Sequence, residues 1–446
     1  MNNITLSSFI VVMGMLACAL HAQVIIQVPG EYPTIQAAVD AAYSGDTILV
    51  APGTYQENIR IQGNDKIITL ASNFIFSGDT TDINNTIIDG SNPVESDYGM
   101  VVLIKNQVAS PSTKIMGFTI TGGKGYYQTY GGGFYTSAAA PVIEYNHIQN
   151  CSVTGVQPNG AGIYIGNAAG NPSMICSINH NVIRNCTINT VINSVVANGA
   201  GISVNSVKAV IEENEIKDNI ILGNSTASCS GGGIYYFGNI PEDFHPQLSI
   251  IHNEITYNRV ESWQAEGGGV SLYGYTQYII EGNIISSNEA ASTNISGYAL
   301  GGGLDIFNPG PGSVISNNII SYNHSYEGPY SSARFGGGIY LTRNPNQLPE
   351  IYPLIEKNRI TGNTASYGAG IAFVRTGARL INNFISGNMA LMAGGAVYFC
   401  GPADTALVSE VINNTITQNS ASSQEGKGGS IYYMGEIKVL LMNDIF

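Results

Sequence analysis

Short apolar segments alternate with glycine-rich and asparagine-rich steps along residues 131–446. Within the segment GGGIYL, Ile339 and Leu341 fall on one side of an extended chain and Tyr340 on the other. That two-residue period is typical of a half-buried strand and not of a helix. A second phrase, apolar-x-x-Asn-x-Ile-x-x-Asn, is also short, β-branched and bounded by turn residues. The pattern therefore predicts short strands joined by tight corners.

The two phrases recur ten times at intervals of 25 to 40 residues, which indicates a repeat architecture. Each repeat is one unit that cannot bury its apolar face alone and must stack on its neighbours, as in a parallel β-solenoid. Glycine suits the corners because it adopts positive φ, and a buried asparagine amide finds its partner in the next coil. The first asparagine of the second phrase falls at Asn146, Asn181, Asn214, Asn253, Asn283, Asn318, Asn358, Asn383, Asn414 and Asn443.

The common register makes two further predictions about the interior. In the first two repeats the last asparagine of the phrase is replaced by Cys151 and Cys186. In-register residues on neighbouring parallel strands lie about 4.8 Å apart, so a disulfide is one interpretation and a pair of stacked free thiols is the favoured one. The register also predicts one interior row that consists of Ile216, Ile255, Ile285, Ile320 and Ile360.

The chain begins with a segment typical of an export signal, residues 1–22, with an apolar core, no acidic residue and a cleavage point after Ala22. A degenerate lipoprotein signal ending at Cys18 is the alternative. Residues 23–446 are then the mature chain, which we expect to be one domain. No later segment approaches the roughly 18 apolar residues of a membrane span. The mature chain is therefore expected to be soluble or tethered only at an end.

Both ends of the predicted solenoid have distinctive sequences. Residues 33–45 predict a short amphipathic helix with Thr34 as N-cap and Gly45 at its C-terminal end. This helix precedes the first predicted strand, Thr47 to Val50, and would cover the apolar interior of the first coil. The chain stops at Phe446, inside a second phrase, so we expect the complete reading frame to be longer.

Composition narrows the possible partners. Charged residues make up 11% of the chain, the net charge is −14, and Lys and Arg are nowhere clustered. Nucleic acid and anionic membrane surfaces are therefore poor candidates. The five cysteines of the mature chain fit neither a disulfide framework nor a zinc pattern.

The run PTIQAAVDAAYSGDTILVAPGTYQENI at residues 33–59, followed by KIITLAS, resembles the opening of pectin-lyase-like right-handed parallel β-helix proteins, including the NosD-like periplasmic proteins. The later coils look like the generic repeats of that superfamily. The resemblance implies a single right-handed parallel β-helix, all-β, of about eleven or twelve coils. It implies no activity, because the pectin methylesterase signatures fail: Asn73 stands where a catalytic Asp is needed, and Trp263 has no neighbouring Arg. The calcium-binding carboxylates of pectate lyases are not apparent either.

A second resemblance is to the repeats of polymorphic outer-membrane adhesins, which pair GGAI with Phe-x-x-Asn. This chain mostly has Ile, Leu or Val before x-x-Asn. The likeness favours a role at a cell surface.

The position after each inward apolar residue is expected to face outward, and tyrosine fills it in six of the ten repeats. Amphipathic rings are good platforms for sugars, although tyrosine also has high strand propensity, and both interpretations remain open. The predicted ligand-binding residues are Tyr135, Tyr164, Tyr235, Asp305, Tyr340, Tyr398 and Tyr432.

Asp305 is the ionisable member of that row and the weak catalytic candidate, as an acid, a base or a calcium ligand. Catalysis on sugars usually needs a second group, which could come from Arg334, Arg343, Glu281 or Glu327. We expect no cofactor, with calcium as the one possibility; the oxygen-rich segment 77–84 is better explained as an ordinary turn. His147, His180 and His252 never pair at metal-ligand spacing and are interpreted as strand-face residues.

Together these features predict an exported or cell-surface scaffold without catalytic activity that binds polysaccharide or another extracellular surface. A polysaccharide lyase or another carbohydrate-active enzyme is the alternative, and a purely structural spacer is a third interpretation.

Overall fold

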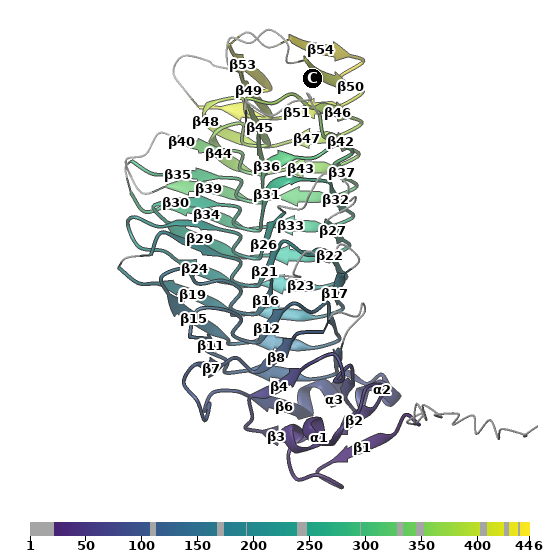
Figure 1. Cartoon of the computed structure of the whole chain (residues 1–446). Helices are drawn as coiled ribbons and strands as arrows, with labels where there is room; N and C mark the ends of the chain where they lie inside the picture. Colours follow the sequence, from purple (N-terminus) through teal and green to yellow (C-terminus); the bar gives the residue numbers. More distant parts are fainter. Residues whose placement is uncertain are drawn as a thin grey trace, which may run out of the picture.

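A computed structural model describes residues 22–107, 113–166, 174–192, 194–238, 248–294, 296–327, 333–344, 352–401, 408–422, 428–435 and 438–446. The predicted export signal and Cys18 lie outside the described residues, apart from Ala22. The described chain winds into a tall stack of coils whose successive strands pair in parallel (Figure 1). The predicted parallel β-solenoid is confirmed.

Three long parallel sheets, which we call A, B and C, form the walls of the stack. Sheet A has 14 strands, and sheets B and C have 12 each. Sheet A consists of β1 (Ile25–Val28), β2 (Thr47–Val50), β5 (Thr69–Ser72), β9 (Lys114–Met116), β13 (Val142–Glu144), β17 (Ile175–Asn179), β22 (Lys208–Glu212), β27 (Leu248–Ile251), β32 (Tyr278–Glu281), β37 (Val314–Ser316), β42 (Leu354–Glu356), β46 (Arg379–Ile381), β50 (Val408–Ile412) and β54 (Lys438–Met442).

Sheet B follows sheet A in each coil, and sheet C closes the coil. Sheet B consists of β3 (Gly53–Tyr55), β6 (Thr86–Asp89), β10 (Thr119–Thr121), β14 (His147–Gln149), β18 (Val182–Arg184), β23 (Glu215–Lys217), β28 (Glu254–Thr256), β33 (Ile284–Ser286), β38 (Ile319–Ser321), β43 (Arg359–Thr361), β47 (Phe384–Ser386) and β51 (Thr415–Thr417). Sheet C consists of β4 (Ile59–Gln62), β8 (Val102–Lys105), β12 (Phe134–Ser137), β16 (Ile163–Gly166), β21 (Ile202–Asn205), β26 (Ile234–Phe237), β31 (Val270–Thr276), β36 (Leu304–Pro309), β41 (Ile339–Thr342), β45 (Ile371–Val374), β49 (Val397–Cys400) and β53 (Ile431–Met434).

Between sheets B and C the chain makes an excursion that the sequence did not predict. Successive excursions stack into a further sheet, which we call the fin and which projects to the left of the body in Figure 1. Its outgoing strands are β15 (Ser152–Gly155), β19 (Thr187–Thr190), β24 (Ile220–Leu222), β29 (Arg259–Ser262), β34 (Glu289–Ser292), β39 (His324–Glu327), β44 (Thr364–Tyr367), β48 (Met389–Ala393) and β52 (Ser420–Ala421). Its returning strands are β20 (Val196–Asn198), β25 (Ser228–Ser230), β30 (Gln264–Glu266), β35 (Tyr298–Leu300) and β40 (Ala333–Phe335).

Buried asparagines join the coils at the corner between sheets A and B. The side chain of Asn253 donates to the carbonyl of Ile211 at 2.8 Å and to Oδ1 of Asn283 at 3.0 Å. Oδ1 of Asn283 also accepts the backbone N–H of Asn253 at 2.8 Å. Because each buried amide is satisfied by the coils on either side, the ladder fixes the register. A second ladder, which runs from Asn219 to Asn419, occupies the last position of the same phrase.

The predicted ladder is wrong in its last member. Asp444, and not Asn443, accepts the backbone N–H of Asn414 at 2.8 Å and its side-chain amide at 3.0 Å. Asn443 lies one residue earlier, in the corner, with a φ of 56°. Either residue type can accept these hydrogen bonds, so the sequence phrase alone did not distinguish them.

The predicted interior row is confirmed. Ile216, Ile255, Ile285, Ile320 and Ile360 pair in register on consecutive strands of sheet B, and each is fully buried. Cys151 and Cys186 are also buried, and both thiols are free. The N–H of Cys186 donates to Oδ1 of Asn219 at 3.0 Å, so the two cysteines continue the second ladder downward.

Helix α1 (Ile35–Ala41) begins as predicted, with the Thr34 hydroxyl accepting the N–H of Ala37 at 3.2 Å, but it ends before the predicted Gly45, with Ala42 as its C-cap. It buries Ile35, Ala38 and Val39 against the first coil. Strand β1 precedes it and pairs with β2, so the first strand lies earlier than predicted.

The oxygen-rich segment 77–84 is not the ordinary turn that the sequence favoured. The chain forms α2 (Phe74–Ser77) and α3 (Thr80–Asn85), and Asp79 caps α3 by accepting the N–H of Thr81 at 2.9 Å. The hydrogen bonds from Thr81 hold the pKa of Asp79 below its usual range. The oxygens therefore serve a helix N-terminus.

Candidate functional site

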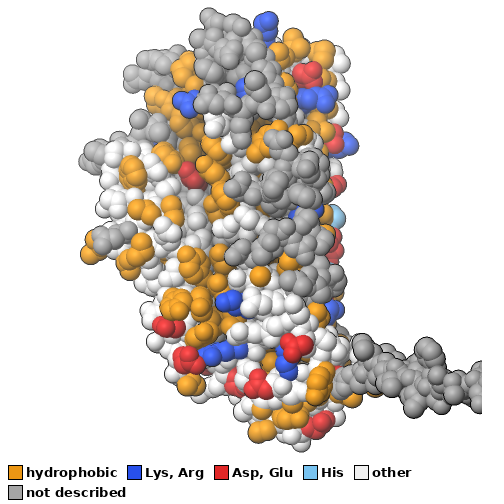
Figure 2. Space-filling model, in the orientation of Figure 1, with side chains coloured by type: hydrophobic (Ala, Val, Ile, Leu, Met, Phe, Trp, Pro, Cys, Tyr) orange, Lys and Arg blue, Asp and Glu red, His pale blue; other side chains and the backbone are white. Residues whose placement is uncertain are grey.

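The outer face of sheet C meets the returning strands of the fin at an angle, which we call the corner. Figure 2 shows hydrophobic side chains gathered along this crease, with charged side chains toward its lower end. The predicted ligand residues lie on the sheet C side of the corner and are in register on neighbouring strands: Tyr135 with Tyr164, Tyr235 with Ser271, Ser271 with Asp305, Asp305 with Tyr340, and Tyr398 with Tyr432.

Midway up the corner, two carboxyl groups come from its two sides and interact electrostatically. Asp305 comes from sheet C and accepts a hydrogen bond from Ser271 Oγ at 2.9 Å. Glu266 comes from the fin and accepts from the hydroxyls of Tyr298 and Ser230, each at 2.9 Å. Burial and then the charge on Glu266 raise the pKa of Asp305 well above its usual range, and burial also raises that of Glu266. Glu266 is thus the second carboxyl group that the sequence could not place.

The groups that the sequence offered for this role are elsewhere or are not described. Glu281 ends strand β32 of sheet A and accepts from the side chain of Asn317 at 3.3 Å, on another face. Arg343 donates to the carbonyl of Arg375 at 3.1 Å, just after β41. Arg334 lies in β40 of the fin, and the side chain of Glu327 is outside the described residues.

The upper tyrosines are not free surface platforms. Tyr340 and Tyr398 retain only 7% and 2% of their accessible surface. Both pack against Phe335 of the fin, with ring centroids 6.1 and 5.9 Å away, and Tyr398 also contacts Tyr367 at 5.2 Å. Both rings lie on the outer side of sheet C, as expected, but the fin covers them, so they are buried instead of exposed to a ligand. Tyr432 stacks on Tyr398 at 5.9 Å and is partly exposed.

The lower tyrosines form a partly exposed aromatic run. Tyr135 and Tyr164 stack with centroids 5.5 Å apart and planes 10° apart. Tyr126, from the short strand β11 (Gly125–Tyr126), stacks on Tyr135 at 4.9 Å, and Tyr130 lies 5.2 Å from Tyr164. Burial raises the pKa of Tyr164 to about 12. Burial also raises the pKa of Tyr126 and Tyr135, so these three hydroxyls stay neutral and can donate hydrogen bonds.

A second aromatic stack lies beside Asp305 and Glu266, which we call the acid pair. Phe237, Tyr273 and Phe307 follow one another on β26, β31 and β36, two residues beyond Tyr235, Ser271 and Asp305 on the respective strands. The ring centroids are 5.7 and 4.4 Å apart, and Tyr273 is 40% exposed. These aromatics occupy the second outward position of their strands, whereas the recurring tyrosine that the sequence predicts for ligand binding occupies the first.

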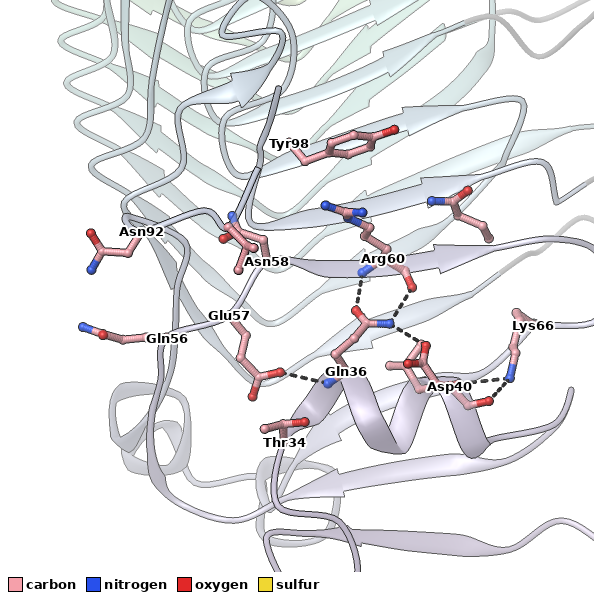
Figure 3. A pocket seen from close by; sticks show the side chains of 13 residues that line it. Thr34, Gln36, Asp40, Gln56, Glu57, Asn58, Arg60, Lys66, Asn92 and Tyr98 are labelled. Carbon is pink, nitrogen blue, oxygen red and sulfur yellow. Dashed lines mark hydrogen bonds between the residues drawn. The ribbon is translucent and has the colours of Figure 1, made fainter. Parts of the chain in front are cut away.

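At the foot of the corner lies a pocket of about 650 Å³, between α1 and the first strands of sheet C (Figure 3). Gln62 and Tyr98 also line a smaller hollow that reaches Tyr126 and Tyr135, so the pocket adjoins the aromatic run. The lining is rich in amides and charges and consists of Thr34, Gln36, Val39, Asp40, Gln56, Glu57, Asn58, Arg60, Gln62, Lys66, Asn92, Val94 and Tyr98.

The polar groups of the pocket are held by hydrogen bonds to one another (Figure 3). Gln36 accepts the backbone N–H of Arg60 at 2.7 Å and donates to Asp40 at 2.8 Å. The carboxylate of Glu57 accepts the N–H groups of Ile35 and Gln36, each at 2.9 Å, at the N-terminus of α1. A carboxylate there is favoured by the helix dipole, so the wall of the pocket is preorganised.

Both cations of the pocket have partners within the protein. Lys66 donates to the carbonyls of Asp40 and Ala42 at the end of α1, at 2.8 and 2.5 Å. The Arg60 guanidinium lies 3.9 Å from the centroid of the Tyr98 ring and pairs with Glu95 at 3.0 Å. The pocket therefore offers amides and an aromatic face more than free positive charge.

The stacked parallel sheets and a family match together define a right-handed parallel β-helix repeat protein. A family model described as a right-handed beta helix region matches residues 245–443. A segment of 102 residues is 33% identical to the probable autotransporter YfaL of Escherichia coli (strain K12). The match covers 22% of this chain and only 8% of that protein. No solved structure is significantly similar to this chain.

These similarities are compatible with a surface or secreted protein. The narrower likenesses to NosD-like proteins and to polymorphic adhesins stay predictions. Among the described residues, none of the helices has the length and apolar character needed to cross a membrane.

Proposed function

We propose that this protein is an exported β-helix scaffold that binds polysaccharide along the corner, from the pocket at its foot to the aromatic run above. The observation that carries the proposal is the continuity of the two: Gln62 and Tyr98 belong both to the pocket and to the hollow that reaches Tyr126 and Tyr135. Sugars present C–H faces and hydroxyls together. This surface offers aromatic rings for the C–H faces and amide groups for the hydroxyls.

The charged groups of the pocket favour a neutral polysaccharide over an acidic one. Arg60 and Lys66 are engaged by Glu95 and by the helix carbonyls, so neither is free to pair with a uronate. Farther up, Glu266 and Asp305 are carboxyl groups, and neither of them can pair with a uronate. A neutral chain of hexoses meets neither obstacle.

The test is retention on immobilised neutral and acidic polysaccharides, together with calorimetry on soluble oligosaccharides. Tyr98→Ala and Tyr135→Ala should each weaken binding by about 0.5 to 1.5 kcal/mol, because each removes one stacking platform. Tyr322→Ala is the matched control, since Tyr322 is 62% exposed and lies in the loop after β38 of sheet B. Equal binding by all three variants, or no binding to any polysaccharide, would contradict the proposal.

The acid pair keeps a carbohydrate-active enzyme as the second candidate. A buried acid with a raised pKa beside a second carboxyl group is the arrangement that glycosidases use. The same panel distinguishes the two functions: new reducing ends or unsaturated products, abolished by Asp305→Asn, would indicate the enzyme. Binding without products supports the scaffold.

A further inference from the structure

A second cluster of chemically active side chains lies on the opposite side of the body, in the turns that join sheet A to sheet B. Histidine and glutamate occupy equivalent positions in the turn from sheet A to sheet B on consecutive coils, at His180, Glu213 and His252. All three have a left-handed φ, between 52° and 54°. The expectation that His180 and His252 lie on strand faces is therefore wrong, and stacking brings together side chains that are 33 and 39 residues apart.

Backbone hydrogen bonds fix these positions. The N–H of His180 donates to the carbonyl of Glu212 at 3.1 Å, and that of Glu213 donates to Ile251 at 3.1 Å. The N–H of His252 donates to Glu281 at 2.9 Å. Each of these three turn residues is thus tied to the coil above it, and this fixes where its side chain projects from the body. Figure 2 shows a histidine between acidic side chains along this edge.

Three side chains of the cluster direct ligand atoms toward one another. One donor atom each from Glu212, Glu213 and His252 lies within 4.8 Å of the other two. Ligand atoms bound to one zinc ion at about 2.0 to 2.2 Å are separated by somewhat less than this, so only small side-chain rotations are needed. Glu213 and His252 are exposed and Glu212 is partly exposed, so an ion can reach them.

His180 supports Glu213 from the neighbouring coil. Its Nε2 contacts Oε2 of Glu213, which leaves Oε1 for another partner. The imidazole ring is itself held by the Tyr145 ring, stacked at 4.5 Å, and by Oδ1 of Asn179, 3.3 Å from Nδ1. Carboxylates that bind metals are commonly oriented by such a hydrogen-bonded outer group. This arrangement goes beyond a mere group of exposed acids.

The coil above His252 leaves room for its ring. The equivalent residue in the turn of the next coil is Gly282, with a φ of 67°. A Cβ at this position would approach Cδ2 of His252 to 2.3 Å and Nε2 to 2.7 Å. Any side chain at residue 282 would therefore displace the imidazole from its position beside Glu212 and Glu213.

We propose that Glu212, Glu213 and His252 bind one first-row divalent metal ion, of which Zn²⁺ is the best match, with His180 as a positioning residue. One imidazole and two carboxylates suit zinc and its neighbours better than calcium, which prefers six or more oxygen ligands. Water would complete the coordination. The site lies at the A–B corner, away from sheet C and the fin, so it stands or fails independently of polysaccharide binding.

The experiment is calorimetric titration of the full chain with ZnCl₂ in a buffer free of chelators, with the visible spectrum of bound Co²⁺ as a second probe. We expect one ion per chain and a rise in melting temperature on binding, because the ligand binds the folded state. His252→Ala and Glu213→Gln should each weaken binding by a factor of ten or more. His324→Ala, on the fin, is the matched histidine control and should bind as the wild type does.

Two further variants test the arrangement around the ion. His180→Ala should keep the stoichiometry of one while it weakens binding by about tenfold, as removal of an outer-shell group does. Gly282→Ala should weaken binding although all the ligands remain. Absence of binding in the wild type, or binding that His252→Ala and Glu213→Gln leave unchanged, would overturn the proposal. Loss of the ion in the His324→Ala control would do the same.

Discussion

Ser271 Oγ donates to Oδ2 of Asp305 across 2.9 Å, so a hydrogen bond joins two consecutive coils inside the corner. Asp305 is 4% exposed and interacts electrostatically with Glu266 of the fin. A carboxyl group so placed is easier to bury as the neutral acid than as the anion. The corner therefore contains a group whose charge the folded chain resists.

The first prediction concerns pH. The pKa of Asp305 is raised in the folded chain above its unfolded value of about 3.9. Its contribution to stability is then fully present below that unfolded pKa and is lost as the pH rises through the raised folded pKa. Asp305→Asn should match the wild type in melting temperature near pH 4 and exceed it at pH 8. Glu266→Gln should act in the same direction, because the pKa of Glu266 is also raised.

Thermal unfolding followed by circular dichroism between pH 4 and pH 9 measures this difference. Glu281→Gln, on sheet A, serves as the control for loss of one negative charge. A wild-type advantage that grows with pH would contradict the assignment of a raised pKa.

The second prediction concerns the interior row of sheet B. Ile320→Asp should destabilise the chain by several kcal/mol, because it buries an unpaired charge among fully buried isoleucines. Ile319→Asp is a close control, since the neighbouring residue on β38 is 41% exposed. Denaturant unfolding measures both variants. Equal midpoints for the two would defeat the register.

The third prediction concerns the tyrosines beneath the fin. Tyr398→Ala should cost about 3 kcal/mol or more, because the ring is 2% exposed and packs against Phe335 and Tyr367. Tyr322→Ala, with its ring 62% exposed, should change the free energy of unfolding by less than about 0.5 kcal/mol. If Tyr398→Ala proves as mild as its control, the fin does not seal this part of the corner.

The fourth prediction concerns the covered end of the solenoid. Deletion of residues 33–45 removes α1 and exposes the apolar residues against which Ile35 and Val39 pack. The deletion variant should self-associate, because the first coil then presents uncovered apolar surface. Sedimentation velocity over a range of concentrations measures this, with Asp40→Ala as a control on the exposed side of the helix. A deletion variant that stays monomeric at high concentration would count against the lid.

The sequence by itself determined the solenoid, its inward rows and its first asparagine ladder. A two-residue apolar period and a repeated asparagine phrase leave few other ways to bury Ile320 and to satisfy the amide of Asn253. The error at Asn443 is a shift of one residue. It arose because the aspartate at position 444 accepts the same hydrogen bonds as the asparagine of the phrase.

Only the tertiary structure decided where the chemistry lies. The excursions that form the fin vary in length and sequence. No periodic pattern therefore predicted that they cover Tyr340 and Tyr398, or that they bring Glu266 near Asp305. The cluster of Glu212, Glu213 and His252 depends in the same way on how many residues each coil contains. Stacking sets which side chains become neighbours at about 4.8 Å, and sequence spacing does not record it when coil length varies.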